Sequence, residues 1–423
     1  MRLFSPLRLR DPGCMWRTLH PNVKTRITTS FLSRVVGSMV FPFMAIYFTA
    51  HLGAALAGTL LLAAGVAQFL AGLYGGALTD ALGRRRTLLT GEGLKLLAFT
   101  LMLLGNLHGP NPWVTFAALL LVNVSGGLIN PAAEAMLVDV STPETRTFMY
   151  AVNYWAVNLS ILIGTLAGGW LYRDHFTLLL ALLVGMSVIT AALCFALMTE
   201  TRAASPTARA DLGLKPLLRS YAQVVTDRPF LLFVLGGILI LSIEFTRTTH
   251  IAVHLAQHFP RADWLGVPLD GVRAASVLTA VNTLMIVALT APVARWLTGR
   301  DPRRPMHAGF ALFALGFAAL AFSTHLPTLI AASVILSVGE LLYVPTRQAL
   351  LADLIPEGRR GAYLATHGQV FTISKWVAAL GLPAGAAIGG AGMAAALLLL
   401  GLLGSLFTAL ALRPGAGERM ARA

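Results

Sequence analysis

Four carboxylic acids lie inside long apolar stretches of this sequence, where a charge is costly. A charged side chain at the centre of a bilayer costs about 2.5–3.5 kcal/mol or more, so such a group is either paired or functional. Burial disfavours the charged form of a carboxyl group, and an acid without a partner can therefore load and release a proton. The four acids are Glu92, Glu134, Glu244 and Glu340.

Basic residues near two of these acids suggest local pairing. Glu92 precedes Lys95 by three positions, and Glu244 precedes Arg247 by three. Residues three apart are neighbours on the surface of a helix. Each pair is therefore either a self-neutralising structural unit or a pair that opens during function.

The other two acids have no cation close by in the sequence. Glu134 has Asn130 one turn away, and Glu340 has Arg347 only two turns on, about 10 Å at 1.5 Å per residue. We predict that Glu340 is the first candidate for a proton or substrate carboxylate. Asp139 ends another apolar stretch and is either a coupling acid or a helix-end ion pair, for instance with Arg146.

The amino-acid composition indicates that these apolar stretches lie in a membrane and not in water. Hydrophobic residues make up 56% of the 423 residues and charged residues only 12%, about half the usual quarter of soluble proteins. So few charges could not cover the surface of a soluble protein of this size. The two cysteines, Cys14 and Cys194, suggest neither a disulfide framework nor a metal site. The chain is predicted to be an all-α integral membrane protein.

Twelve apolar runs are long enough to span a bilayer, which takes about 20 residues. With both termini placed in the cytoplasm, 24 of the 32 lysines and arginines fall in inner segments and three in outer segments. This bias follows the positive-inside rule and favours an even number of spans. The predicted spans are Thr25–Ala50, Leu56–Leu78, Leu88–Leu107, Trp113–Val138, Phe148–Leu171, Leu178–Met198, Phe230–Ala252, Ala274–Leu297, His307–Ser323, Leu326–Leu351, Ala362–Ala387 and Met393–Leu412.

The chain also repeats itself at half its length. The segment Pro131–Asp139 resembles Pro345–Asp353, and both the proline and the aspartate are offset by 214 residues. Six plus six helices in the same orientation indicate two halves related by a pseudo-two-fold axis, with the substrate path between them. The predicted organisation is a cytoplasmic tail (1–24), an N-terminal six-helix bundle (25–198), a cytoplasmic linker (199–229), a C-terminal six-helix bundle (230–412) and a cytoplasmic tail (413–423).

The loop after the second span carries a glycine-flanked acid followed by arginines. In order, these residues are Gly76, Asp80, Gly83, Arg84 and Arg85. Such a turn can latch a gate at the inner rim, although the arginines alone could be a membrane anchor. The G-x-x-x-D-x-x-G-R-R order resembles the signature loop of the major facilitator superfamily, which implies that family's twelve-helix fold.

A second resemblance concerns the fifth span and scattered segments of the chain. Gly164, Gly168 and Gly169 form an element similar to the G-P-x-x-G-G motif of drug:proton antiporters, with Thr165 in place of the proline. Segments such as Ile46-Tyr47-Phe48 and Gly339-Glu340-Leu341-Leu342-Tyr343 resemble the LmrP-type multidrug:proton antiporters.

This resemblance implies roles in proton coupling for four positions. Glu340, Asp139 and Arg26 match functional residues of that family, although Arg26 could equally be an interfacial anchor. The family's acid in the seventh span falls near Thr248 here. Glu244 lies one turn earlier on the same helical face and could take its place.

Several aromatic and polar residues in the spans are candidates for lining a cavity. Aromatic rings can stack on a flat or cationic ligand, and asparagines can bind it or join helices. His250, His254 and His258 recur every four residues, a spacing that could hold a metal on a helix, but no metal or cofactor is expected. The cavity candidates are Tyr47, Asn130, Tyr154, Trp155, Asn158, Tyr343 and Arg347.

These observations predict a secondary active transporter of a bacterial cytoplasmic membrane, monomeric and in contact with membrane lipids. It would export hydrophobic, cationic compounds in exchange for protons by alternating access, because acids in an apolar cavity attract cations. Nothing resembles an ATP-binding loop, a nucleic-acid site or a catalytic cluster, so an enzyme or a receptor is disfavoured. The five bases in the spans leave open an anionic or zwitterionic lipid or metabolite as cargo. They are Arg34, Lys95, Arg247, Arg347 and Lys375.

Overall fold

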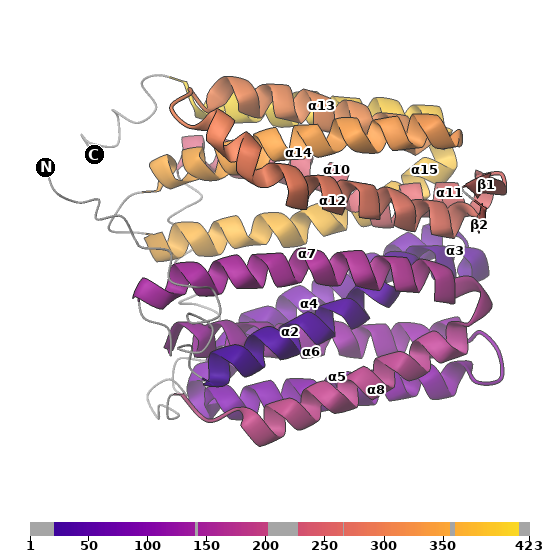
Figure 1. The fold of residues 1–423 in the computed structure, drawn as a ribbon, viewed down its shortest axis with the longest axis vertical. Helices are drawn as coiled ribbons and strands as arrows, with labels where there is room; N and C mark the ends of the chain where they lie inside the picture. The colour runs from indigo at the N-terminus through magenta and orange to yellow at the C-terminus, as the bar shows by residue number, and fades with distance from the viewer. Residues whose placement is uncertain (1–20, 140–142, 202–226, 265, 356–359, 414–423) are drawn as a thin grey trace, which may run out of the picture. The chain divides into compact units, whose positions relative to one another are not determined.

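The structure is a computed structural model that describes residues 21–139, 143–201, 227–264, 266–355 and 360–413 (Figure 1). Nearly all of these residues are helical. The predicted tails and the predicted linker lie mostly outside the described residues. The side chains of Asp80 and Tyr154, both predicted site residues, and that of Asp353 are also outside the description.

The first six predicted spans are present as helices. Two glycines with positive φ, Gly53 (80°) and Gly83 (97°), allow sharp turns between consecutive helices. The elements are α2 (Pro21–Val40), η1 (Phe41–Phe43), α3 (Met44–Leu52), α4 (Ala54–Leu82), α5 (Arg84–Asn106), α6 (Pro112–Asp139), α7 (Pro143–Asp174) and α8 (Phe176–Leu197).

The remaining spans follow the same pattern. Asp227 caps α10 by accepting from the backbone N–H of Phe230 at 3.1 Å, and Asp270 caps α12 in the same way. The elements are α10 (Arg228–Phe245), η2 (Thr246–Thr248), α11 (His250–His258), β1 (Ala262–Trp264), β2 (Val267–Leu269), α12 (Gly271–Leu297), α13 (Arg303–Phe322), α14 (Leu326–Leu354) and α15 (Arg360–Ala411).

The last helix contains two spans. α15 has 52 residues and would be about 78 Å long if straight, far more than the roughly 30 Å hydrocarbon core. Gly389, with φ 69° and ψ 177°, interrupts the helical geometry between the predicted eleventh and twelfth spans. With α15 counted as two, the eleven membrane-long helices of the described residues become the twelve spans that the sequence predicts.

A short hairpin is the one departure from an all-helical chain among the described residues. β1 pairs antiparallel with β2, with Ala262 opposite Leu269 and Trp264 opposite Val267. Gly266, at φ 79°, supplies the left-handed conformation that a two-residue hairpin turn needs. The hairpin lies beside α11 at one end of the C-terminal helices (Figure 1).

The first and seventh spans are both discontinuous. Pro42 lies in η1, where its ring and missing N–H prevent a regular helix. At η2, the hydroxyl of Thr246 donates to the carbonyl oxygen of Ile243 at 2.6 Å, and Thr248 and Thr249 donate to that of Phe245. Such hydroxyl bonds compete with the helical ladder and bend helices. η1 and η2, at corresponding places of the two halves, contact each other.

The helices gather into two compact units. One comprises Met1–Gly37, Ala67–Ile161 and Leu180–Leu212, and the other Ser38–Val66, Leu162–Leu179 and Gly213–Ala423. In the second unit, α10, α12, α13, α14 and α15 lie side by side around a core that includes Phe233, Phe310, Phe313 and Phe317 (Figure 1).

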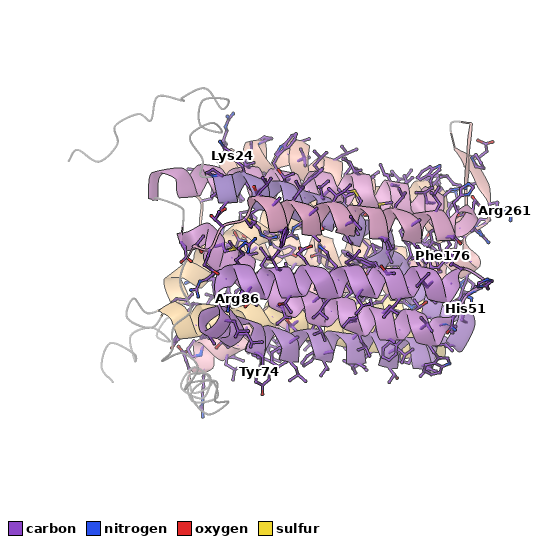
Figure 2. The ribbon with its side chains drawn as sticks, turned by 90° about the horizontal axis from the view of Figure 1, so that it is seen from below. Lys24, His51, Tyr74, Arg86, Phe176 and Arg261 are labelled. Atoms are coloured by element: carbon purple, nitrogen blue, oxygen red, sulfur yellow. The ribbon has the colours of Figure 1, made fainter. Side chains whose placement is uncertain are left out.

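Figure 2 shows which labelled residues lie at the ends of the helices in each unit. In the first unit, Lys24 at the start of α2 and Arg86 at the start of α5 lie at the same end (Figure 2). In the second unit, His51, Phe176 and Arg261 lie together at one end (Figure 2). The basic residues Lys24, Arg86 and Arg261 thus lie at or just beyond the ends of helices.

Candidate functional site

The break in the seventh span places two charged side chains where α10 ends. Glu244 is in the last turn of α10, and Arg247 lies in η2. Their spacing would make them neighbours on a regular helix. The ion pairs of the described residues nevertheless do not include Glu244 with Arg247. The self-neutralising pair that the sequence allowed is not formed.

Arg247 is held by neutral groups on other helices. Its Nη1 donates to Oδ1 of Asn282 on α12 at 3.0 Å. Its guanidinium carbon lies 5.1 Å from the ring centroid of Phe317 on α13, within cation–π range. Its Nη2 is buried without a hydrogen-bond partner among the described residues. One donor of the guanidinium is thus free for another group.

Asn282 joins Arg247 to Glu340. Its amide nitrogen donates to Oε2 of Glu340 at 3.0 Å and to Oγ of Ser337 at 2.9 Å. An amide has one acceptor oxygen and one donor nitrogen, so the oxygen must face the arginine and the nitrogen the carboxylate. The carboxylate of Glu340 therefore meets the cation only through a neutral amide. The sequence gave no sign of this bridge or of Ser337.

The two acids of this region lie within electrostatic reach of each other. Glu244 interacts with both Glu340 and Arg247, and Tyr343 interacts with both acids. Two neighbouring carboxylates in a low-dielectric site are costly to ionise together. The arrangement therefore suits the binding of one positive charge, either a proton or a cationic ligand.

Thr248, where the resemblance expects an acid, has a structural contact. Its hydroxyl donates to the carbonyl oxygen of Phe245 at 3.2 Å, which helps to shape η2. Glu244, one turn earlier, is the acid nearest to this position in the sequence. Whether it takes over the role of the missing acid stays a prediction.

The cations of the spans do not pair with acids of their own helices, with one exception. Arg347 donates from Nη2 to the carbonyl oxygen of Phe233 at 3.1 Å, and its guanidinium lies over the ring of Phe233 at 4.5 Å. Lys375 lies against aromatic rings. Arg34 is exposed on α2 and within electrostatic reach of Glu134 on α6. The exception is Lys95.

Lys95 and Glu92 form a closed, buried pair in the first unit. Lys95 Nζ lies 2.6 Å from Glu92 Oε2. The ammonium group also donates to the hydroxyls of Ser33 on α2 and Thr190 on α8, at 3.0 and 3.2 Å. Thr190 in turn donates to Glu92 at 3.1 Å. The structural alternative for this pair agrees with the geometry, because the charges are satisfied and join three helices.

Three further predicted residues lie on α2 and α6 of the first unit. Arg26 is within electrostatic reach of Glu92 and Glu134, and its Nε is buried without a hydrogen-bond partner among the described residues. Glu134 and Asn130 are both exposed, one turn apart on α6. Their side chains are thus open to a ligand.

An apolar groove of about 890 Å³ separates α2 from α7. Trp155, a predicted cavity residue, is 60% exposed and lines this groove. Asn158 is half-buried one turn further along α7. The complete lining is Ile27, Thr28, Phe31, Val152, Trp155, Ala156 and Leu159.

Two of the predicted cavity aromatics are packed inside the protein instead. Tyr47 is 2% exposed, and its ring stacks on Phe176 with centroids 5.5 Å apart. Tyr343 is 5% exposed and packs between Phe310 and Phe313 at 5.3 and 5.0 Å. The sequence predicted that both tyrosines line a cavity, because a side chain with a polar tip and an apolar ring suits a cavity wall as well as the protein interior. In this structure neither side chain is open to a ligand.

The arginines of the loop after α4 clamp three segments together. Arg84 lies 3.3 Å from Asp139 through Nε and donates from Nη1 to the carbonyl oxygen of Thr79 at 3.1 Å. Arg85 donates to the carbonyl oxygens of Met198 and Phe195 at 2.7 and 2.8 Å. Asp139 is thus part of this clamp; Arg146, its predicted alternative partner, lies outside the described side chains.

Glu200 completes the clamp and was missed by sequence reasoning. Its two carboxylate oxygens accept from the backbone N–H groups of Arg84 and Arg85, each at 3.0 Å. It therefore caps the start of α5, where a negative charge also offsets the helix dipole. The only sequence signal was its place directly after the sixth span.

The glycines between Gly75 and Gly83 differ in whether a larger side chain could replace them. Gly83 has φ 97°, so its backbone favours glycine, whereas the nearest atom to a Cβ there is the flexible carboxylate of Glu200 at 2.8 Å. A Cβ on Gly76 would meet nothing within 4 Å. A Cβ on the neighbouring Gly75 would instead collide with the carbonyl oxygen of Gly127 on α6. In this segment it is therefore Gly75, and not Gly76, that allows a close approach of two helices.

The glycine element of α7 sits at two close helix contacts. A Cβ on Gly168 would collide with the carbonyl oxygen of Met39, and one on Gly169 with the hydroxyl of Ser276 on α12. Gly164 is buried. Beyond this element, Arg173 and Asp174 pair with Asp270 and Arg273 at 3.1 and 2.6 Å. α7 is thus tied to the start of α12 by close packing and by two ion pairs.

The three histidines of α11 stack instead of converging. Their ring centroids lie 5.9 Å apart for His250 and His254 and 5.0 Å apart for His254 and His258. Among the described residues there is no group of three or more potential ligands that could hold a metal.

Comparisons with known proteins agree with this architecture. The sequence model of the Major Facilitator Superfamily matches residues 27–269 and 269–420. A Na(+), Li(+), K(+)/H(+) antiporter of Planococcus maritimus is 30% identical over 381 residues, covering 86% of this chain and 89% of the relative. The multidrug resistance protein MdtH of Yersinia pestis is 27% identical over 336 residues, covering 77% of each.

Solved structures show the same fold at low sequence identity. A peptide transporter POT in complex with sulfate aligns with a TM-score of 0.73 at 16% identity, covering 95% of this chain and 99% of that one. The human organic anion transporter MFSD10 aligns with a TM-score of 0.64 at 15% identity, covering 92% and 99%. With both halves matched by the family model, this chain belongs to the major facilitator superfamily of membrane transporters.

Proposed function

We propose that the chain is a proton-coupled antiporter that exports hydrophobic, cationic compounds by alternating access. The observation that carries this proposal is the pair of acids at the break of the seventh span. Glu244 and Glu340 lie within electrostatic reach of each other, and neither forms an ion pair with a cation among the described residues. Such a pair favours one positive charge at a time, so a proton and a cationic cargo compete for it.

The first unit has an apolar groove of its own that suits an aromatic compound. The apolar groove beside Trp155 offers a ring face for stacking, and Glu134 and Asn130 are open polar groups on α6. Rocking of the two halves would then expose the site to each side of the membrane in turn. The names of the relatives, an ion/proton antiporter and a multidrug resistance protein, support this proposal.

The proposal includes a location, an orientation and an energy source. The protein would lie in a bacterial cytoplasmic membrane with both termini inside, as the positive-inside bias predicts. It would act as a monomer without a cofactor and draw its energy from the proton gradient. Reporter fusions at the two ends would test the orientation independently of transport.

Proteoliposomes with an imposed pH gradient test the function directly. We expect uptake of a fluorescent lipophilic cation into liposomes that are acidic inside, and release of internal protons as the cation enters. The variant Glu340→Gln should bind the dye weakly and show no proton release. Dye uptake that continues after the gradient is collapsed with an ionophore would contradict proton coupling.

A second cargo class is supported by the relative from Planococcus maritimus. Its name describes exchange of Na(+), Li(+) and K(+) for protons, and it covers 86% of this chain. Carboxylate and amide oxygens such as those of Glu340 and Asn282 are ligands that hard cations accept. Adding NaCl, LiCl or KCl to acid-loaded liposomes without any dye would reveal this activity as proton release.

A further inference from the structure

Lys375 on α15 has the most unusual surroundings of any cation in the C-terminal spans. Its Nζ lies 4.7 Å from the ring centroid of Phe371 and 5.6 Å from that of Phe245. The two rings pack edge to face with centroids 4.9 Å apart, so they form one aromatic corner. No carboxylate of the described residues pairs with the ammonium group, and no described residue accepts a hydrogen bond from it.

The other two cations of these spans have acceptors. Arg247 donates to the amide oxygen of Asn282, and Arg347 to the carbonyl oxygen of Phe233. Aromatic faces attract a cation but accept no strong hydrogen bond, so the three donors of an ammonium group are not satisfied by rings alone. Among the described residues, Lys375 therefore has no hydrogen-bond acceptor for its N–H groups.

The neighbours of Lys375 along α15 show which side of the helix it occupies. Ser374 points toward α10, because its hydroxyl donates to the carbonyl oxygen of Ile238 at 3.0 Å. Trp376 points toward α4, because its ring lies where a side chain on Gly65 would be. Lys375 falls on the arc of the helix between these two contacts.

This arc is open to a ligand. Phe371, one turn before Lys375 on the same face, is 53% exposed, and Gly368 is also exposed. Lys375 itself is half-buried. A flat molecule resting on the Phe371 ring would bring any acidic substituent to the ammonium group.

We propose that Lys375, Phe245 and Phe371 form a subsite for the carboxylate of an aromatic, zwitterionic cargo. The carboxylate accepts hydrogen bonds from the Lys375 ammonium group, and the ring system of the cargo lies against Phe371. A charged hydrogen bond of this kind is stronger than a neutral one and is strongest away from water. The subsite rests on the proposed export function and extends its range from cations to compounds that also carry an acid.

A matched pair of dyes tests this subsite. Rhodamine B carries a free carboxylate, whereas its ethyl ester has the same ring system and positive charge without the acid. We expect Lys375→Met to weaken binding of rhodamine B at least about tenfold and to leave the ester unchanged. Fluorescence polarisation on purified protein measures both affinities, with protein-free detergent as the blank.

The variant Lys375→Arg is the control, because it keeps the charge. It should bind both dyes within about threefold of wild type, since a guanidinium also binds a carboxylate. Unchanged binding of the ester by Lys375→Met shows that the fold is intact. Equal loss of both dyes would show a structural lysine and overturn the subsite, as would unchanged binding of rhodamine B.

Two further outcomes distinguish failure of the Lys375 subsite from failure of the proposed export function. A wild-type protein that exports the ester but does not bind rhodamine B overturns the subsite and leaves the proposed function standing. A protein that binds neither dye overturns both. Adding phosphatidylglycerol tests a lipid as the occupant: if it displaces rhodamine B from wild type at the concentrations found in membranes, the acid at Lys375 belongs to a lipid and not to cargo.

Discussion

Glu92 with Lys95 and Glu244 with Arg247 have the same spacing in the sequence and opposite arrangements in the structure. The first pair closes at 2.6 Å and is surrounded by hydroxyls of two other helices, α2 and α8. The second stays open, and Arg247 turns to a neutral amide on α12. An acid and a base three positions apart thus form a closed ion pair in one half of the chain, whereas in the other half they form no ion pair with each other.

The two pairs of charges lie on different kinds of backbone. α5 is a continuous helix from Arg84 to Asn106, so residues three apart face each other. α10 ends at Phe245, and Arg247 lies in the 3-10 turn that follows, where its guanidinium donates to Asn282 on α12. At this break the two charges thus stay apart, with Arg247 held by a neutral amide and Glu244 in no ion pair among the described residues.

The largest effect should follow from opening the closed pair. Lys95→Met leaves Glu92 buried without its cation, and removing one partner of a buried pair costs about 3–5 kcal/mol. We expect strong loss of thermal stability in detergent, measured by the midpoint of unfolding. The double variant Glu92→Gln with Lys95→Met should restore stability and keep transport. If the single variant is as stable as wild type, the pair is not a structural clamp.

The open site should show the reverse pattern, with activity lost and stability kept. Glu340→Gln mimics the protonated acid and should abolish proton-driven export while the unfolding midpoint changes little. Distances between labels at the two membrane faces, followed across pH, give a second readout. A pH-dependent shift that persists in Glu340→Gln would assign the titration to another acid.

Variants of Glu244 test most directly whether this acid belongs to an open site or to a structural ion pair. Glu244→Gln should also abolish proton-driven export, and adding Arg247→Leu should not restore it, because Arg247 forms no ion pair with this acid and donates to Asn282 instead. A structural pair would behave like Glu92 and Lys95, with the double variant recovering. Transport by the double variant near the wild-type rate would end the coupling role of Glu244.

Much of the fold could be predicted because it depends on properties that a sequence shows directly. Apolar length fixed the spans, and the offset of Pro131 and Pro345 showed the repeat. The hairpin after α11 escaped because its strands have three residues each and lie in a short loop. The break at η2 left no distinct pattern, since threonine hydroxyls can also bond to the backbone within an unbroken helix.

The site was less predictable because its contacts join distant segments. Glu340 stood out as an acid in a span, but its contact with Asn282 across 58 positions leaves no local pattern. Glu200 looked like part of a linker, although it caps α5 from 116 positions away. Tyr47 and Tyr343 looked open because burial of an amphipathic ring depends on neighbours that only the fold supplies.

The smallest effect should come from the bridge between the charges. Asn282→Ala removes the amide that accepts from Arg247 and donates to Glu340 and Ser337. Losing hydrogen bonds to charged groups costs about 1.5–3 kcal/mol each, but water that enters the space left by the side chain can replace part of this. We expect export to fall about tenfold, by loss of orientation, without the complete loss expected for Glu340→Gln.

Ser337→Ala is the matched control for this bridge. Ser337 accepts from the same amide nitrogen at 2.9 Å but touches neither charge through it, and its own hydroxyl donates to the carbonyl oxygen of Ser333. Its removal should therefore leave export within about threefold of wild type. Equal defects in Asn282→Ala and Ser337→Ala would show that the amide acts through packing. A defect confined to Asn282→Ala would show that the open pair depends on this one neutral group to hold its two charges apart.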